Sequence, residues 1–137
     1  MQSLECQIQE HDCGDFYSVA GVIVDVEGSR KGDKGPITYK KGGEKFTGVT
    51  SRIIRDVDHE KPVGQWNTIE LIAFGGTCIH VVNGKVNMVM TNSRHKVDGK
   101  VVPLTKGKIQ LQSEGAEVFY WNIAVKPIKA IPAEYLK

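Results

Sequence analysis

Cysteine is scarce in this sequence, and its spacing excludes the sites that cysteine usually builds. The chain has 137 residues and three cysteines, Cys6, Cys13 and Cys78, with no CxxC pair. An odd count at wide spacing supports neither a zinc site nor a full disulfide framework. A bridge between Cys6 and Cys13 would require their strands to meet, so we expect reduced, buried thiols instead.

Charge of one sign, aromatic residues and long apolar runs are also in short supply. The formal net charge is +2, and aromatic residues make up 7% of the chain. Even between Arg30 and Lys45 the basic residues alternate with glycines, which predicts a solvated loop and no nucleic-acid partner. No apolar run approaches the about 20 residues of a membrane span, and the first residues lack the pattern of a signal peptide. We therefore expect no membrane association and no signal peptide in this chain.

Residues 65–91 carry the clearest structural signal, three strands joined by two glycine turns. Asn83-Gly84 separates two runs rich in β-branched residues, and a two-residue Asn-Gly loop is the strongest short-range signal of a β-hairpin. Both central residues of a type I′ turn need a positive φ, which Asn tolerates and Gly adopts without steric cost. Gly75-Gly76 predicts a similar turn one strand earlier. The segment therefore predicts a three-stranded antiparallel sheet that the rest of the chain must pair with or cover.

Alternation of apolar and polar residues predicts further strands on both sides of this segment. The candidates are residues 4–10, 16–19, 20–26, 51–57, 108–112 and 117–128, with a short edge strand at 37–39 inside a loop at 28–43. Residues 92–104 are expected to be a polar connection that contains a candidate hairpin turn at Asp98-Gly99. No stretch has the period of an amphipathic helix, apart from one helical turn expected within 132–136. We predict one all-β antiparallel domain at 1–128, a β-sandwich or barrel, followed by a tail at 129–137.

Polar side chains on the first predicted strand and the turn after it form the first candidate site. Glu5 and Gln7 are two residues apart and project from one face of a strand, while Asp12 and Asp15 follow on the adjoining turn beside His11. Carboxylates grouped in this way can bind sugar hydroxyls, hold a divalent cation, or act as acid and base. The alternative is that they are solvated strand residues.

A second candidate set lies nearer the C-terminus. Gln112 occupies the polar face of its predicted strand, and Glu114 lies at the following turn. Trp66 and Trp121 can stack on the apolar face of a pyranose, and Tyr17 is similarly placed, although large aromatic residues in strands are more often core residues. The chain has no G-x-S-x-G, P-loop or H-E-x-x-H pattern, so the enzyme classes built on those motifs have no support.

Five short motifs in a fixed order carry a resemblance to a known family. The order ECQIQ, GDFY, GQWN, an NG hairpin and GKIQLQSEGAEVFYWNI resembles the 3-keto-disaccharide hydrolase family over residues 4–128. The resemblance implies a concanavalin-like jelly roll that acts on oxidised glycosides, in a family whose members are often secreted or periplasmic. Family domains have further strands before the E-x-Q-I strand, so we expect an incomplete sandwich in one chain. A homodimer or another association would then complete it.

The resemblance implies two interpretations of function, both with a saccharide ligand. In the first, a hydrolase or lyase acts on 3-keto-glycosides, with Glu5, Asp15 and Glu114 as catalytic candidates. A divalent cation is the one cofactor candidate, and Asp12 is its candidate ligand. The predicted substrate-binding residues are Gln7, His11, Tyr17, Trp66, Gln112, Trp121 and Asn122. The second interpretation is a non-catalytic carbohydrate-binding or oligomeric assembly module, favoured by Trp121, which stands where the family commonly has an arginine.

Overall fold

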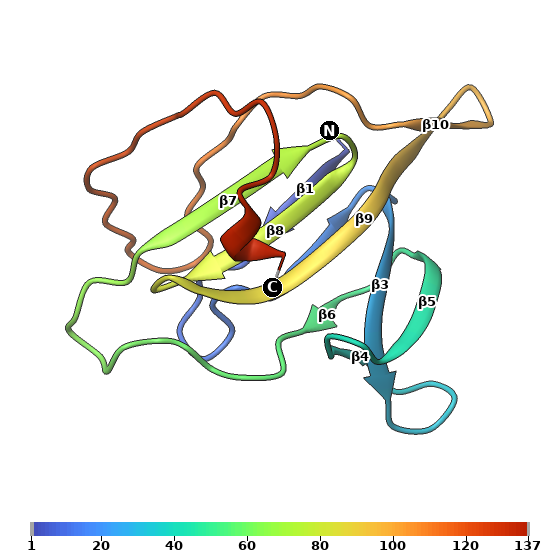
Figure 1. Cartoon of the computed structure of the whole chain (residues 1–137). Coiled ribbons are helices and arrows are strands. Elements are labelled where there is room, and N and C mark those ends of the chain that lie inside the picture. Colours follow the sequence, from blue (N-terminus) through green and yellow to red (C-terminus); the bar gives the residue numbers. More distant parts are fainter. Residues whose placement is uncertain (1, 137) are drawn as a thin grey trace.

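The computed structural model describes residues 2–136, which form ten strands and one 3₁₀ turn (Figure 1). The strands are β1 (Ser3–Cys6), β2 (Phe16–Val19), β3 (Ile23–Arg30), β4 (Ile37–Tyr39), β5 (Glu44–Val49), β6 (Ile53–Ile54), β7 (Ile69–Phe74), β8 (Thr77–Val82), β9 (Lys85–Val97) and β10 (Lys100–Pro103). The turn, η1, spans Ala133–Tyr135. Within the described range no helix has the length and apolar character to cross a membrane. The predictions of an all-β protein and of one helical turn within 132–136 are confirmed.

The three-stranded core predicted at 65–91 is present as β7, β8 and β9. Asn83 and Gly84 have φ values of 51° and 76°, and Val82 pairs with Lys85 across the turn. The Asn83 side chain also accepts a hydrogen bond from the Thr68 amide at 2.9 Å. The turn is therefore fixed by its own backbone chemistry and by contacts with the loop that precedes β7.

All ten strands belong to one sheet that curves until it is nearly closed like a barrel (Figure 1). Its order is β1-β2-β6-β4-β3-β9-β8-β7, with β10 paired to β9 and β5 paired to β3. The pairing is antiparallel except between β4 and β6, which run parallel. Ile53 of β6 pairs with both Phe16 and Ile37, so this two-residue strand joins β2 to β4. The structure is one mixed sheet, whereas the sequence predicted only antiparallel pairs.

Several predicted boundaries are wrong. Residues 92–104 are not a polar connection, because β9 continues to Val97 and pairs with β10. The hairpin turn between them is at Asp98-Gly99, as predicted, with φ values of 48° and 78°. The strand β5 was not expected, and β4 lies between β6 and β3 rather than at an edge.

The strands predicted at 108–112 and 117–128 are absent. Residues 105–131 contain no strand or helix, and no backbone–backbone hydrogen bond joins them to the other described residues. Alternating side chains give a segment two different faces, but a strand also needs a neighbouring edge that supplies its hydrogen bonds. Residues 105–131 form no such backbone bonds, although the Gln112 side chain contacts Glu5 of the edge strand β1.

The buried core has two parts, one on each face of β8. The first contains Phe16, Ile37 and Met88 together with Cys78 of β8. The second contains Ile72, Ile79 and Val81, and Ile128, Ile131 and Tyr135 pack against it. Tail residues therefore cover one face of β8, while the domain boundary at 128 stays a prediction. The three cysteines are free, and Cys13 and Cys78 are buried.

Candidate functional site

The turn between β1 and β2 fixes the positions of three candidate residues. The Gln7 amide donates to the Asp15 carbonyl at 2.9 Å, and the Gly14 amide donates to the Gln7 carbonyl at 2.8 Å. Gly14 has a φ of +90°, and a Cβ atom there would lie 2.0 Å from Asn87 Nδ2. A residue with a side chain therefore does not fit at position 14. The closed turn holds His11, Asp12 and Asp15 in place.

Asp15 is fully buried and is bonded to two arginines. Arg52 donates to Asp15 Oδ2 from Nη2 at 2.6 Å and from Nε at 3.0 Å. Arg55 donates to Oδ1 from Nη1 at 3.1 Å and from its backbone amide at 3.0 Å. Both carboxylate oxygens are thus occupied by donors within the protein. This geometry favours a structural role for Asp15, because the carboxylate has no open side toward solvent.

Asp12 extends the same ion-pair network toward the surface. Its Oδ1 lies 2.6 Å from Arg52 Nη2, and the Asp12 side chain is partly exposed. The Arg52 guanidinium also lies 5.1 Å from the centroid of the Tyr17 ring, a cation–π contact. Tyr17 and Asp12, which the sequence proposed separately, are therefore joined through Arg52.

The segment after β6 adds two carboxylates to this network. Asp58 Oδ2 lies 3.3 Å from Arg55 Nη2, and Glu60 Oε2 lies 3.7 Å from the same atom. Burial raises the pKa of Glu60, and the nearby Asp58 charge raises it further. We call the six residues the acid–arginine cluster: Asp12, Asp15, Arg52, Arg55, Asp58 and Glu60.

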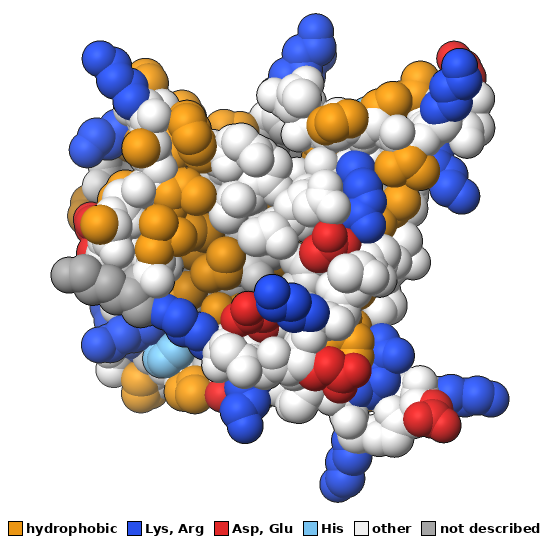
Figure 2. Space-filling view, turned by 45° about the vertical axis from the view of Figure 1, so that its right-hand side comes forward, with side chains coloured by type: hydrophobic (Ala, Val, Ile, Leu, Met, Phe, Trp, Pro, Cys, Tyr) orange, Lys and Arg blue, Asp and Glu red, His pale blue; other side chains and the backbone are white. Residues whose placement is uncertain are grey.

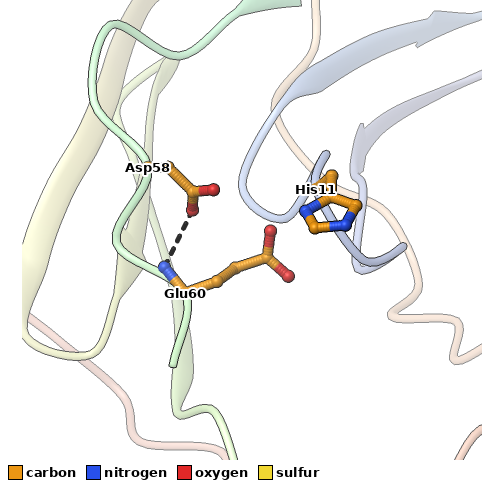
Figure 3. A group of neighbouring side chains, drawn as sticks. All are labelled: His11, Asp58 and Glu60. Atoms are coloured by element: carbon orange, nitrogen blue, oxygen red, sulfur yellow. Dashed lines mark hydrogen bonds between the residues drawn. The ribbon is translucent and has the colours of Figure 1, made fainter. Parts of the chain in front are cut away.

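His11 lies against the edge of the acid–arginine cluster. Ligand atoms of His11, Asp58 and Glu60 all lie within 4.8 Å of one another. Figure 3 shows the Glu60 carboxylate between Asp58 and the His11 imidazole. The Asp58 carboxylate accepts a hydrogen bond from the Glu60 amide at 2.9 Å, which lowers the pKa of Asp58. These three side chains are of the types that bind metal ions.

A shallow depression of about 350 Å³ opens over this region. Its lining includes His11, Asp12, Arg52, Arg55 and Asp58. Carboxylates, an imidazole and guanidinium groups therefore face one solvent-accessible space. Such a combination can exchange protons and stabilise a negative charge.

Other predicted residues are paired elsewhere. Gln112 Nε2 donates to Glu5 Oε2 at 3.5 Å, which connects the first strand to the C-terminal segment. The Gln7 side-chain oxygen accepts from the amides of Ile8 and Gln9, so it closes its own turn. Glu114 and Asn122 are exposed, and Asn122 has a φ of 55°. None of these five residues lines the depression.

Trp66 and Trp121 are brought together on the surface. Their ring centroids lie 6.1 Å apart with an interplanar angle of 48°. The side chains remain 57% and 77% exposed, so neither is the core residue that large aromatics in strands usually are. Two exposed indoles in contact form a surface on which the apolar face of a sugar can stack.

A second, larger hollow lies elsewhere, between β3, β5, β9 and the tail. It has a volume of about 600 Å³, with Tyr39, Phe46, Val86 and Val89 among its apolar lining residues. Asp25, Glu27, Lys41 and Lys45 also line it, and Lys41 Nζ donates to the Leu136 carbonyl at 3.2 Å. No residue proposed from the sequence lines this hollow.

Sequence reasoning missed the basic half of the acid–arginine cluster. Arg52 and Arg55 were read as residues of a strand, and Asp58 and Glu60 as residues of a charged turn. The available signal was a short segment with two arginines and two acids, Arg52, Arg55, Asp58 and Glu60, in a chain that also has two aspartates on an earlier turn. It is weak, because about 40 residues separate the partners along the chain.

The fold defines an all-β protein built on one curved mixed sheet. The family model of the 3-keto-alpha-glucoside-1,2-lyase-like domain matches residues 1–126. The chain belongs to this family, and the resemblance inferred from its motifs is confirmed. No curated protein and no solved structure matches the chain.

Proposed function

We propose that the protein is a hydrolase or lyase that cleaves 3-keto-glycosides at the depression over the acid–arginine cluster. Family membership supports the substrate class. The observation that carries the site is the meeting of proton acceptors and guanidinium groups around one open space. Elimination beside a ketone needs both kinds of group.

In the proposed reaction, a base removes the proton from the carbon beside the 3-keto carbon. The electron pair of that C–H bond forms an enolate, and the negative charge is spread onto the keto oxygen. The enolate then expels the glycosidic oxygen, which takes up a proton, and a double bond remains. Addition of water across that double bond completes hydrolysis. Arg52 lines the depression and is the candidate for stabilising the enolate oxygen.

The geometry favours His11, Asp58 and Glu60 as the source of the proton acceptor. Asp15 is fully buried between two arginines. Glu114 is exposed and does not line the depression. His11 and Asp58 line the depression, and Glu60, which is not among its lining residues, is held between these two side chains (Figure 3).

Turnover of a 3-keto-glucoside, followed by release of the free sugar, tests this proposal. Glu60→Gln should slow the reaction by about 10²-fold or more, while Glu114→Gln should leave it unchanged. Loss of turnover in Glu114→Gln or Glu5→Gln, with Glu60→Gln still active, would contradict the choice of base. A folded wild-type protein without turnover would contradict the enzyme.

The second candidate function is carbohydrate binding without catalysis, and the exposed Trp66–Trp121 contact favours it. Stacking on an indole would be lost in Trp121→Ala, whereas Trp121→Phe keeps an aromatic face. Titration of a saccharide by tryptophan fluorescence measures the affinity. Equal affinity in wild type and Trp121→Ala would rule out this surface.

We also propose that a second copy of the chain covers the exposed apolar face of the C-terminal segment. Phe119, Ile123 and Val125 lie on this face and are all at least 64% exposed. Figure 2 shows hydrophobic side chains gathered on one side of the surface, with lysines and arginines projecting at its margins. Exposed apolar surface of this extent favours association. A homodimer formed in this way would supply the strand neighbours that a concanavalin-like jelly roll needs.

A further inference from the structure

We propose that His11, Asp58 and Glu60 together bind a divalent metal ion. The three residues come from two segments, the turn after β1 and the loop after β6. Their ligand atoms lie within 4.8 Å of one another, so one ion can reach all three after small side-chain movements. Figure 3 shows the three side chains converging on one point from these two segments.

An orphaned oxygen supports this assignment independently of the spacing. Glu60 Oε2 is buried and has no hydrogen-bond partner in the described structure. Its nearest cationic atom is Arg55 Nη2 at 3.7 Å, which is beyond hydrogen-bond distance. A buried carboxylate oxygen without a partner is unfavourable. A metal ion between Asp58 and His11 would satisfy it.

The net charge of the acid–arginine cluster also favours a bound cation. Four carboxylates and two guanidinium groups leave a net charge of −2 when His11 is neutral. Both guanidinium groups are drawn toward Asp15, since each donates to one of its oxygens. The excess negative charge therefore lies on the side of Asp58 and Glu60. A divalent cation bound there would neutralise it.

A bound ion would lie beside the Arg55 guanidinium, so the contacts of Arg55 must be compatible with it. Arg55 keeps its bonds to Asp15 and to the His11 carbonyl in either case. Its contacts with Asp58 and Glu60 are longer, at 3.3 and 3.7 Å, and these are the ones an ion would replace. The ion would thus add to the existing ion pairs without removing the buried Asp15 contacts.

One imidazole and two carboxylates favour a transition metal such as Mn²⁺ or Zn²⁺ over Mg²⁺ or Ca²⁺, which prefer oxygen ligands. Three protein ligands leave coordination positions open, and His11 and Asp58 line the depression from which a solute would approach. A bound ion of this kind supplies Lewis-acid chemistry. The inference rests on the proposed function and modifies it, because side chains held as ligands would act through a water bound to the ion, which would then be the proton acceptor.

Calorimetric titration of the chelator-treated full chain with ZnCl₂ and with MnCl₂ tests the site by binding alone. We expect saturable binding of one ion per chain and a metal-dependent rise in melting temperature. His11→Gly and Glu60→Gln should each weaken binding at least about tenfold, since even outer-shell changes have effects of this size. Glycine is chosen at position 11 because His11 has a φ of 67°.

Asp56→Asn is the matched control, because Asp56 lines the same depression but is not one of the three ligands. It should bind the ion as the wild type does. No binding in the folded wild type, or binding unchanged in both His11→Gly and Glu60→Gln, would overturn the inference. Ion binding without turnover would support the metal site and contradict the proposed enzyme activity. If the chelator-treated protein binds neither ion and still turns over the substrate, the metal site would be contradicted and the enzyme proposal supported.

Discussion

The chain contains two regions that have similar sequence patterns and different structures. Residues 3–103 form the curved sheet, with side chains such as Phe16, Ile53 and Ile79 fully buried. Residues 104–132 contain no strand or helix, although stretches within them, such as 108–112, alternate as β1 does. Phe119 is 69% exposed, while Phe16 is 0% exposed. Alternation gives both regions apolar side chains, but only the first region forms backbone pairs between strands, while the second adds Ile128 and Ile131 to the packing against the core.

The comparison also separates the two candidate functions. The acid–arginine cluster lies within the first region and is held by short ion pairs to a fully buried aspartate. The Trp66–Trp121 surface depends on the second region for one of its two rings. Catalysis at the cluster should therefore depend on the folded sheet. Binding at the tryptophans should instead depend on where the C-terminal segment lies.

Matched phenylalanine-to-alanine substitutions should give the largest difference in unfolding free energy between the two regions. Phe16→Ala should lower the free energy of unfolding by about 3 to 5 kcal/mol, because it empties a buried site in the core. In the dissociated monomer, Phe119→Ala should change it by less than about 0.5 kcal/mol, because the side chain is exposed there. Urea unfolding followed by circular dichroism measures both. A similar loss in the two variants would mean that residues 104–132 are packed in solution.

A matched pair of carboxylate substitutions should give the next largest effect. Asp15→Asn should destabilise the protein by about 3 kcal/mol, since it removes the buried carboxylate that lies closest to the Arg55 guanidinium. Glu114→Gln, in the second region, should have almost no effect because Glu114 is exposed. Thermal unfolding of both variants is the measurement. A stable Asp15→Asn protein would show that the ion pairs do not hold the cluster together.

Acid titration should reveal a buried histidine of the first region. Burial lowers the pKa of His80 to about 4 from an ordinary value of 6.5, although the Asp15 charge opposes the shift. His80 Nδ1 lies 3.0 Å from the Gly14 carbonyl. Only the unfolded chain takes up this proton between pH 6.5 and 4, so stability is complete above 6.5 and falls with pH through that window. The loss should reach about 3 kcal/mol.

Unfolding free energies of wild type and His80→Gln across this window isolate the contribution of His80. The substitution should flatten the curve while lowering stability at neutral pH. The pKa values of Asp25 and Asp58 are lowered, so protonation of these carboxylates acts at still lower pH. An identical slope in both proteins would mean that His80 is not buried as a neutral ring.

Substitutions in the exposed segment should have the smallest effect on stability and a clear effect on association. Phe119→Ser, Ile123→Ser and Val125→Ser, combined in one chain, should remove the apolar face and yield a monomer. The stability of the monomeric chain should change by less than about 0.5 kcal/mol for each substitution. Light scattering at high concentration measures the mass of both proteins. A well-folded wild-type monomer would contradict the proposed second copy.

Much of the sheet could be predicted from the sequence, and most of the cluster could not. The β8–β9 hairpin follows from Asn83-Gly84, and the β9–β10 hairpin follows from Asp98-Gly99. The strand β5 was missed because Glu44, Lys45 and Gly48 hide its pattern. At the cluster, the turn with Asp12 and Asp15 was identified, while their arginine partners were not.

The sequence by itself determined the turns and the alternation of faces, because both depend on residues that are neighbours along the chain. Asn and Gly accept positive φ wherever they occur, and a period of two gives two faces in any extended segment. Only the tertiary structure decided which alternating segments became strands, since a strand needs a partner edge. It also decided the chemistry of the cluster. The carboxylates of the first turn and the arginines and acids of residues 52–60 meet only because β6 pairs with β2.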